Sequence, residues 1–245
     1  MSTRAAAATA LRVLSQLRRD PRTVALVLLI PCALLTLLKY LFADQPRAFD
    51  RIGVPLVGLL PFLQLFIVTS VTMLRERTSG TLERLMASPL GKLDLLAGYG
   101  IAFALVGAVQ ASIVATYALG ALGLDTAAPA PAVVALAVTN AVLGMSLGLL
   151  ASAFARTEFQ AVQFMPAFIL PQLLLCGLFV PRERMASALE TLAHALPATY
   201  AYDALERLAD DGTLGVGGAL DVAIVLGLTL LSLAVAAATL QRTTA

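Results

Sequence analysis

The stretch IGVPLVGLLPFLQLFIVTSVTML, residues 52–74, contains no charged residue. About 20 consecutive apolar residues suffice for a helix to cross the hydrocarbon core of a bilayer. Pro55 and Pro61 fall inside the stretch, but prolines are tolerated in membrane helices because neighbouring groups satisfy the freed carbonyls. The densest cluster of charged residues in the chain, residues 75–94, follows immediately. The stretch therefore predicts a transmembrane helix that ends at a membrane surface.

The rest of the chain repeats this pattern of long apolar runs. Of its 245 residues, 59% are hydrophobic and only 13% are charged, whereas about a quarter of the residues in soluble domains are charged. This composition excludes a soluble enzyme, a disordered protein and a disulfide-rich scaffold. We expect an all-α polytopic membrane protein, one domain over residues 1–245, with six transmembrane helices. The predicted spans cover residues 23–42, 52–74, 93–119, 133–155, 159–180 and 216–240.

The distribution of charge predicts the orientation. If the N-terminus is cytoplasmic, 11 of the 17 Lys and Arg residues fall in inside segments, and most acidic residues fall outside. Excess Lys and Arg in cytoplasmic segments is the usual bias of membrane proteins. We therefore expect a multi-pass protein of the cell (plasma or inner) membrane with both termini in the cytoplasm.

Two segments outside the spans have amphipathic patterns. Residues 8–19 alternate leucines with arginines and predict a helix lying on the membrane surface, which ends at Asp20-Pro21. Residues 181–215 predict an amphipathic helix, a break at Pro197 and a second amphipathic helix, together forming a re-entrant hairpin at the outer surface. Pro166 and Pro171 predict that the fifth span is kinked or broken.

The loop after the second span predicts a short cytoplasmic helix. Ser79 or Thr81 can cap such a helix, and Pro89 stops its continuation. One face of it carries Leu82, Leu85 and Met86, which suits docking into the groove of a partner protein. The alternative is a solvated loop whose charge only fixes the topology.

The sequence RERTSGTLERLMASPLGKLDLLAGY, residues 75–99, resembles the signature of type-2 ABC exporter permeases, the family of the daunorubicin-exporter membrane subunit. In that family an acidic residue ends span two, a Gly-Thr-Leu-Glu-like core follows, and a Ser/Thr-Pro precedes span three. Glu76, the 80–83 core, Ser88-Pro89 and Gly98 stand at the matching places. Residues 18–31 and 178–205 resemble the family's entry into span one and its outer hairpin.

The resemblance implies that two permease chains pair, as a homodimer or with a close paralogue, and that each docks on a cytosolic ABC ATPase subunit. It makes residues 75–91 the coupling loop and the 8–19 helix a second contact with the ATPase. It also implies ATP-driven alternating access, with a path lined by spans one, two and five. The residues that would couple to the ATPase are Glu76, Gly80, Thr81, Leu82, Glu83, Leu85 and Met86.

The chain lacks an ATP-binding motif of its own. A Walker A loop needs Gly-x4-Gly-Lys-Ser/Thr, but Leu93 follows Gly91-Lys92, and Met86 stands at the first glycine position. ATP and Mg are therefore expected on the partner subunit, with no cofactor in this chain. One histidine and two separated cysteines argue against a metal site. The balanced charge argues against binding of nucleic acid.

The apolar spans suit a hydrophobic drug or lipid-like cargo, exported from the cell, with membrane lipids around the protein. No charged residue lies mid-membrane, which argues against an ion-coupled transporter. Within the spans, buried amides usually form interhelical hydrogen bonds. By family analogy, some of them could line the path instead, and the candidates are Gln64, Gln163 and Gln172.

Two alternative functions remain open. One is a permease that exports a polysaccharide or another polymer. The other is an intramembrane serine hydrolase, because Gly144-Met145-Ser146-Leu147-Gly148 matches the GxSxG pattern. That pattern has a structural explanation too, since Gly144, Gly148 and Ser152 are spaced four apart and form a small-residue stripe for helix packing.

Overall fold

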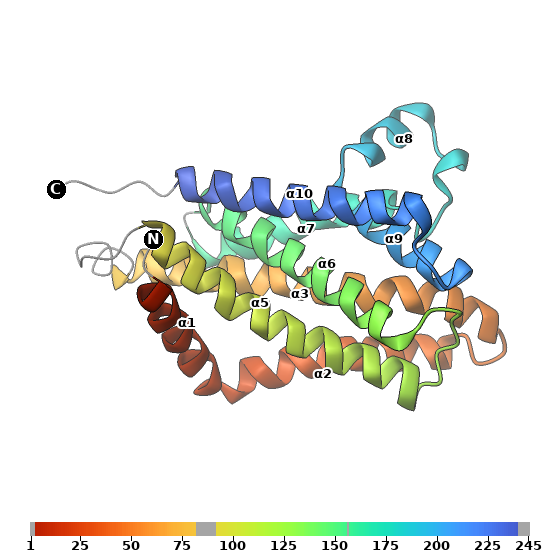
Figure 1. Ribbon diagram of the computed structural model, residues 1–245, viewed down its shortest axis with the longest axis horizontal. Helices are drawn as coiled ribbons and strands as arrows, with labels where there is room; N and C mark the ends of the chain where they lie inside the picture. Colours follow the sequence, from red (N-terminus) through yellow and green to blue (C-terminus); the bar gives the residue numbers. More distant parts are fainter. Residues whose placement is uncertain (1–2, 82–91, 156, 240–245) are drawn as a thin grey trace.

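The computed structural model describes residues 3–81, 92–155 and 157–239. Figure 1 shows that helices dominate the described chain and that the long ones run along roughly one direction. In chain order they are α1 (Thr3–Arg18), α2 (Pro21–Leu41), α3 (Pro46–Thr78), α5 (Lys92–Thr116), the π-helix η1 (Tyr117–Ala121), α6 (Ala130–Ser152), α7 (Glu158–Leu175), the 3-10 turn η2 (Arg182–Arg184), α8 (Ser187–His194), α9 (Pro197–Asp211) and α10 (Gly215–Thr239).

Five helices of the described residues are long and apolar enough to cross a membrane. They are α2, α3, α5 continued by η1, α6 and α10, and each overlaps a span predicted from the sequence. The remaining predicted span, residues 159–180, corresponds to α7, which has 18 residues and includes Glu158 and three glutamines. The sequence and the structure therefore agree on a polytopic helical membrane protein.

The helix α7 differs from its predicted form. The sequence predicts that the fifth span is kinked or broken at Pro166 and Pro171, and the structure shows it unbroken, because one α-helix runs through both prolines. It ends at Leu175, five residues before the predicted end of the span. A proline removes only one backbone hydrogen bond, and the flanking turns can hold the helix together.

The two ends of the bundle carry different elements. In Figure 1, α1 and the last turn of α10 lie at one end, and α8 and α9 lie at the other. We call these the α1 end and the α9 end. The start of α2 and the end of α3 are at the α1 end, where Asp20 caps α2 by accepting a hydrogen bond from the Thr23 amide.

The centre of the bundle is the pair α3 and α6. α3 is the most buried of the five long helices, and its backbone lies directly against α6. A Cβ added at Gly144 would stand 2.0 Å from the Phe62 carbonyl oxygen, and one at Gly148 would stand 2.5 Å from the Phe66 oxygen. The small-residue stripe predicted from the sequence is thus a site of backbone-to-backbone packing.

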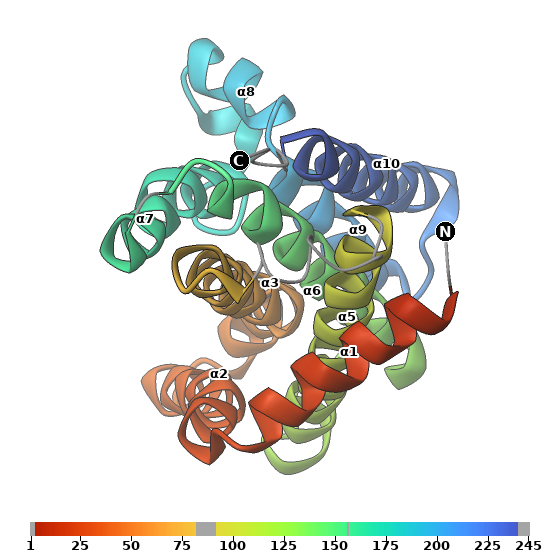
Figure 2. The ribbon, with the colours of Figure 1, turned by 90° about the vertical axis from the view of Figure 1, so that its left-hand side faces the viewer.

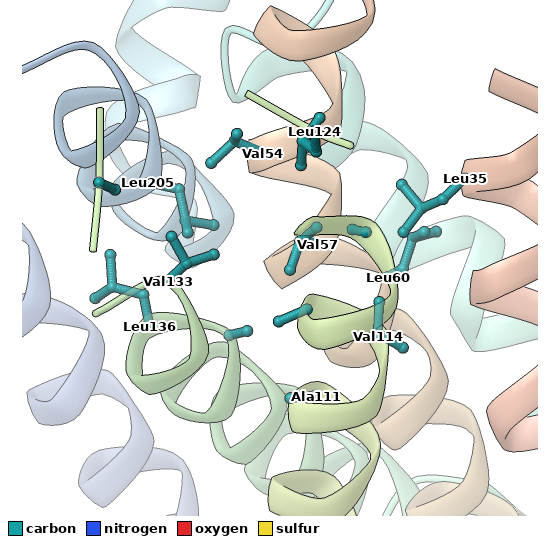
Figure 3. Close-up of a cluster of buried hydrophobic side chains, with 14 of the residues drawn as sticks. Leu35, Val54, Val57, Leu60, Ala111, Val114, Leu124, Val133, Leu136 and Leu205 are labelled. Carbon is teal, nitrogen blue, oxygen red and sulfur yellow. The ribbon is translucent and has the colours of Figure 1, made fainter. Parts of the chain in front are cut away.

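The helix α9 packs into the bundle instead of lying on its surface. Figure 3 shows Leu205 of α9 beside Val133 and Leu136 of α6, in a cluster that extends to Val54 and Val57 of α3. Arg182 forms a 2.5 Å ion pair with Asp203, which fastens the segment after α7 onto α9. Burial raises the pKa of the Asp203 carboxyl above its ordinary value, and the Arg182 charge opposes this shift. One face of the predicted amphipathic helix α9 is therefore covered by protein, whereas α8 exposes its leucines; the position of the two helices at the outer membrane surface stays a prediction.

Candidate functional site at the α1 end

The N-terminal helix α1 lies across α5 in close contact (Figure 2). Its apolar side packs Ala6, Ala10 and Val13 against the bundle. The contact is close because α5 has Gly98 at the crossing point, where a Cβ would stand 2.4 Å from the Thr9 Cβ and 2.8 Å from the Ala6 carbonyl oxygen. Gly98 therefore sets the distance between the two helices.

A glutamate is buried under α1 at the end of α3. The Glu76 side chain is only 8% exposed. Arg12 of α1 contacts it with an N–O distance of 3.4 Å, and the Gln16 amide donates a 3.4 Å hydrogen bond to the carboxylate oxygen Oε1. A buried carboxylate requires such partners, because an unpaired buried charge is strongly unfavourable.

Tyr99 of α5 completes this group. The Arg12 guanidinium donates a hydrogen bond to the Tyr99 hydroxyl and lies 5.7 Å from the centre of its ring. Arg12 thus has a carboxylate partner on α3 and an aromatic partner on α5. We call Arg12, Gln16, Glu76 and Tyr99 the α1 cluster; it joins three helices at one end of the bundle.

The chain turns directly after this cluster. Ser79 ends α3, and Gly80 has a φ of +70°, a conformation that glycine adopts without strain. The Ser79 and Thr81 hydroxyls are 2.9 Å apart. Leu82, Glu83, Leu85 and Met86, and with them the predicted docking helix, lie outside the described residues. The coupling role of all seven predicted residues stays a prediction.

A cleft of about 700 Å³ opens beside the α1 cluster, between α1, the start of α2, α3 and the start of α7. Its apolar wall includes Val68, Val71 and Phe103, and its polar wall includes Glu76 and Asp20. Hydrogen bonds from Thr23 hold the pKa of the Asp20 carboxyl below its ordinary value. The cleft therefore combines an apolar interior with charged groups at its edge.

An ion pair between α3 and α7 lies at the edge of this cleft. Arg75 donates two hydrogen bonds to Glu158, of 2.8 and 2.9 Å, in a bidentate arrangement. Both side chains are about half exposed, so water screens the attraction. Exposed pairs of this kind contribute little to stability, about 0–1 kcal/mol. The pair is easily opened, unlike the buried contact between Arg12 and Glu76.

The three glutamines predicted as path residues lie in different surroundings. Gln64 accepts a hydrogen bond from Gln110 of α5. Gln172 is buried, and its amide oxygen accepts the Ala198 N–H at 3.2 Å, which caps the first turn of α9. Gln163 is exposed on α7. Gln64 and Gln172 thus form the interhelical bonds that amides usually form, and a role for any of the three in the path stays a prediction.

Ser146 has the surroundings of a packing residue. It is fully buried in α6, and its hydroxyl donates to the Leu143 carbonyl at 2.8 Å. His194, the one histidine of the sequence, ends α8. The GxSxG match is thus accounted for by the contact of α6 with α3.

Sequence reasoning missed Arg12, Gln16 and Tyr99 as members of the site. A signal was present, because a carboxylate at the end of an apolar span needs a partner if it becomes buried. The sequence predicts residues 8–19 only as an amphipathic helix on the membrane surface, which does not say which arginine faces the bundle. Only the fold shows that Arg12 is turned inward toward α3.

Replacement of Gly98 tests the close packing of α1 against α5. We expect Gly98→Val to lower the free energy of unfolding by about 1–3 kcal/mol, because the added side chain overlaps Thr9 and the Ala6 carbonyl. Gly100→Val is the matched control, since no atom lies within 4 Å of the position of its Cβ. Thermal unfolding in mild detergent measures both; equal midpoints for the two variants would contradict the close contact.

These features define a polytopic membrane protein whose long apolar helices end in a charged cluster covered by an N-terminal helix. Residues 5–208 match the family model described as ABC-2 type transporter, and the chain belongs to that family. Its similar proteins include the probable multidrug ABC transporter permease YbhR of Escherichia coli K12, which is 30% identical over 156 residues, 62% of this chain and 42% of that protein.

Two further relatives extend the comparison. The linearmycin resistance permease protein LnrN of Bacillus subtilis is 26% identical over 61% of this chain and 40% of its own length. ABC transporter G family member 20 of Dictyostelium discoideum is 27% identical over 66% of this chain and 22% of its own length. The chain thus spans less than half the length of the curated relatives it matches.

Proposed function

We propose that this chain is the permease subunit of an ABC exporter, and that the α1 cluster couples it to an ATPase. The observation that carries the proposal is the burial of Glu76 between Arg12 and Gln16, three residues before the chain leaves α3. Force applied to residues 79–91 by a docked protein would reach α1, α3 and α5 at once. An isolated solvated loop would need no such buried connection.

We further propose that the chain crosses the membrane six times. The five long apolar helices and α7, with its two internal prolines, supply the spans. The excess of basic residues near α1 and near residues 75–92 supports a cytoplasmic α1 end in the plasma or inner membrane. Residues 181–215 then form the re-entrant hairpin at the outer face.

The energy source is proposed to be a separate subunit. This chain lacks a Walker A sequence, so ATP and Mg would be bound by cytosolic ABC ATPase subunits. A second permease chain, identical or paralogous, would complete the complex. The mechanism would be alternating access, in which the two ends of the path open in turn and no covalent chemistry occurs in this chain.

The proposed cargo is a hydrophobic drug or lipid-like molecule. The cleft beside the α1 cluster supports this, because its apolar wall suits a hydrocarbon body and its charged edge suits a polar group. The names of two relatives contain the words multidrug and linearmycin resistance, which describe those proteins. They favour a small hydrophobic cargo here over a polymer.

Co-purification tests the partnership. We expect an affinity-tagged chain, extracted in mild detergent, to retain a stoichiometric soluble subunit that carries a Walker A motif. The double variant Leu82→Ala/Leu85→Ala should lose most of that subunit, because it removes the apolar face of the predicted docking helix. Mass spectrometry of the eluate against the quantity of tagged chain gives the ratio.

A matched control exists at the opposite end of the bundle. Leu189 and Leu192 of α8 have the same spacing and are exposed, with fractions of 45% and 47%. Leu189→Ala/Leu192→Ala should leave the bound subunit in place. If a monodisperse wild-type sample carries no ATPase, or if both double variants retain it equally, the proposed coupling is wrong.

A further inference from the structure

The helix α2 is weakly packed against the rest of the bundle. Its buried residues are Val27, Pro31 and Leu35, which form a single narrow stripe. Only 17% of its most apolar segment is buried, against 67% for α3. Figure 2 shows α2 at the periphery of the bundle. Leucine gains little by leaving lipid for another apolar surface, so apolar contacts alone do not fix the position of this helix.

A proline leaves one carbonyl of α2 without its helical partner. Pro31 has no N–H, so it cannot donate to the carbonyl of Val27, four residues earlier. Gln110 of α5 supplies the missing donor, because its amide nitrogen lies 3.0 Å from the Val27 oxygen. Gln110 is fully buried, and the same nitrogen donates to Gln64 of α3. One side chain therefore joins α2, α3 and α5.

Two more polar contacts fasten the other half of α2. The Thr36 hydroxyl lies 2.7 Å from the Tyr117 hydroxyl at the start of η1. Lys39 donates to the carbonyl of Leu122, which follows the last residue of η1 and has the free acceptor typical of a helix end. We call the pairs Gln110–Val27, Thr36–Tyr117 and Lys39–Leu122 the α2 clasp.

We propose that the α2 clasp holds α2 in one of two positions, and that Gln110 is the positioning residue that sets the balance between them. When the clasp opens, α2 moves away from α5 into lipid, and its apolar surface changes little in environment. Water is scarce within the membrane, so separation of the pairs at Val27 and Tyr117 leaves an unsatisfied polar group and the closed position is favoured. Lys39 is exposed near the end of α2 and adds a contact at that end. The role of this movement in transport rests on the proposed function, whereas the movement itself does not depend on it.

The position of α2 can be measured on this chain alone in lipid nanodiscs. Spin labels are placed on exposed positions of α2 and of the central helix α6, at Leu37 and Ala135, after Cys32 and Cys176 are replaced by Ser and Ala. Double electron–electron resonance spectroscopy then gives the distribution of distances between the two spin labels. We expect one dominant distance for the starting chain.

Gln110→Leu should increase the population at longer distance about threefold, the effect expected for one typical interhelical hydrogen bond in a membrane. Gln64→Leu is the matched control, because it removes the other amide and leaves the Gln110–Val27 contact. It should keep the starting distribution. Thr36→Val, which removes the hydroxyl with little change in shape, should shift it in the same direction as Gln110→Leu.

The role of Pro31 gives a second, independent check. Pro31→Ala restores an N–H that can bond to Val27 within the helix, so Gln110→Leu should have a smaller effect in that background. Unchanged distances in both Gln110→Leu and Thr36→Val would overturn the proposal. Two results would overturn the assignment of Gln110 to the Val27 carbonyl. One is an equal distance shift in Gln64→Leu; the other is a shift caused by Gln110→Leu that is just as large in the Pro31→Ala background.

The link to transport has its own readout. ATP hydrolysis by the complex with the ATPase subunit should change in Gln110→Leu in parallel with the distance shift. A distance shift without such a change would remove α2 from the transport cycle and leave the clasp intact. Absence of any bound ATPase would contradict the proposed function, while the distance measurement would still decide the clasp.

Discussion

Gly144→Val should abolish folding of most of the expressed chain, because the α3–α6 contact leaves no space for a side chain. The nearest atom is the Phe62 carbonyl oxygen, 2.0 Å from the position of an added Cβ, and it belongs to the backbone. A flexible side chain could turn aside, but two helices would have to separate here. Overpacking costs about 1–3 kcal/mol where side chains can adjust, and we expect about 3 kcal/mol or more.

Gly227→Val in α10 is the control for this prediction. It makes the same substitution within an apolar helix, but nothing lies within 4 Å of the added Cβ. The fraction of monodisperse protein recovered from membranes, followed by thermal unfolding, compares the two variants. Similar recovery and similar unfolding midpoints would show that α3 and α6 are not in backbone contact.

If the α1 cluster couples the chain to an ATPase as proposed, Glu76→Lys should reduce ATP hydrolysis by the co-purified subunit more than tenfold. The substitution puts a second cation beside Arg12 at a site where the native carboxylate is only 8% exposed. Both the loss of the ion pair and the new repulsion favour separation of α1 from α3. Tenfold corresponds to about 1.4 kcal/mol, less than the usual cost of breaking a buried pair. Transport-linked ATP hydrolysis by the reconstituted complex is the measurement.

Exchange of the two charges distinguishes loss of the Arg12–Glu76 ion pair from a general loss of stability. The double variant Arg12→Glu/Glu76→Lys restores an opposite pair across the same helices and should recover a substantial part of the activity. Glu158→Lys is the control at the surface, because it breaks an ion pair whose side chains are about half exposed. It should change stability by at most about 1 kcal/mol. Failure of the exchanged pair to improve on Glu76→Lys would contradict pairing of the two residues.

The helical spans were predictable from the sequence because the bilayer sets their length and composition. The predicted range 216–240 and the observed helix Gly215–Thr239 differ by one residue at each end. The helix α3 was predicted too short, since it starts at Pro46 and continues through Arg75 and Arg77 to Thr78. Its end residues are polar and lie beyond the apolar run, where hydropathy carries no information on helix length.

The tertiary partners were not predictable in the same way. The spacing of Leu205 and Leu208 predicts an apolar face on the second amphipathic helix of residues 181–215, but periodicity does not say whether lipid or protein covers that face. Pro31 and Gln110 are both visible in the sequence, one as a lost donor and the other as a polar residue within a span. Their pairing depends on the rotation of α2 relative to α5, which no local pattern fixes.

The dimensions of α3 have a mechanical consequence. A helix of 33 residues is about 50 Å long, whereas the hydrocarbon core is about 30 Å thick. The backbone contacts with α6 occur at Phe62 and Phe66, close to its midpoint. If α3 tilts about this central contact, its two ends move in opposite directions. A tilt that moves the Glu76 end one way therefore moves the Arg47 end by a similar distance the other way.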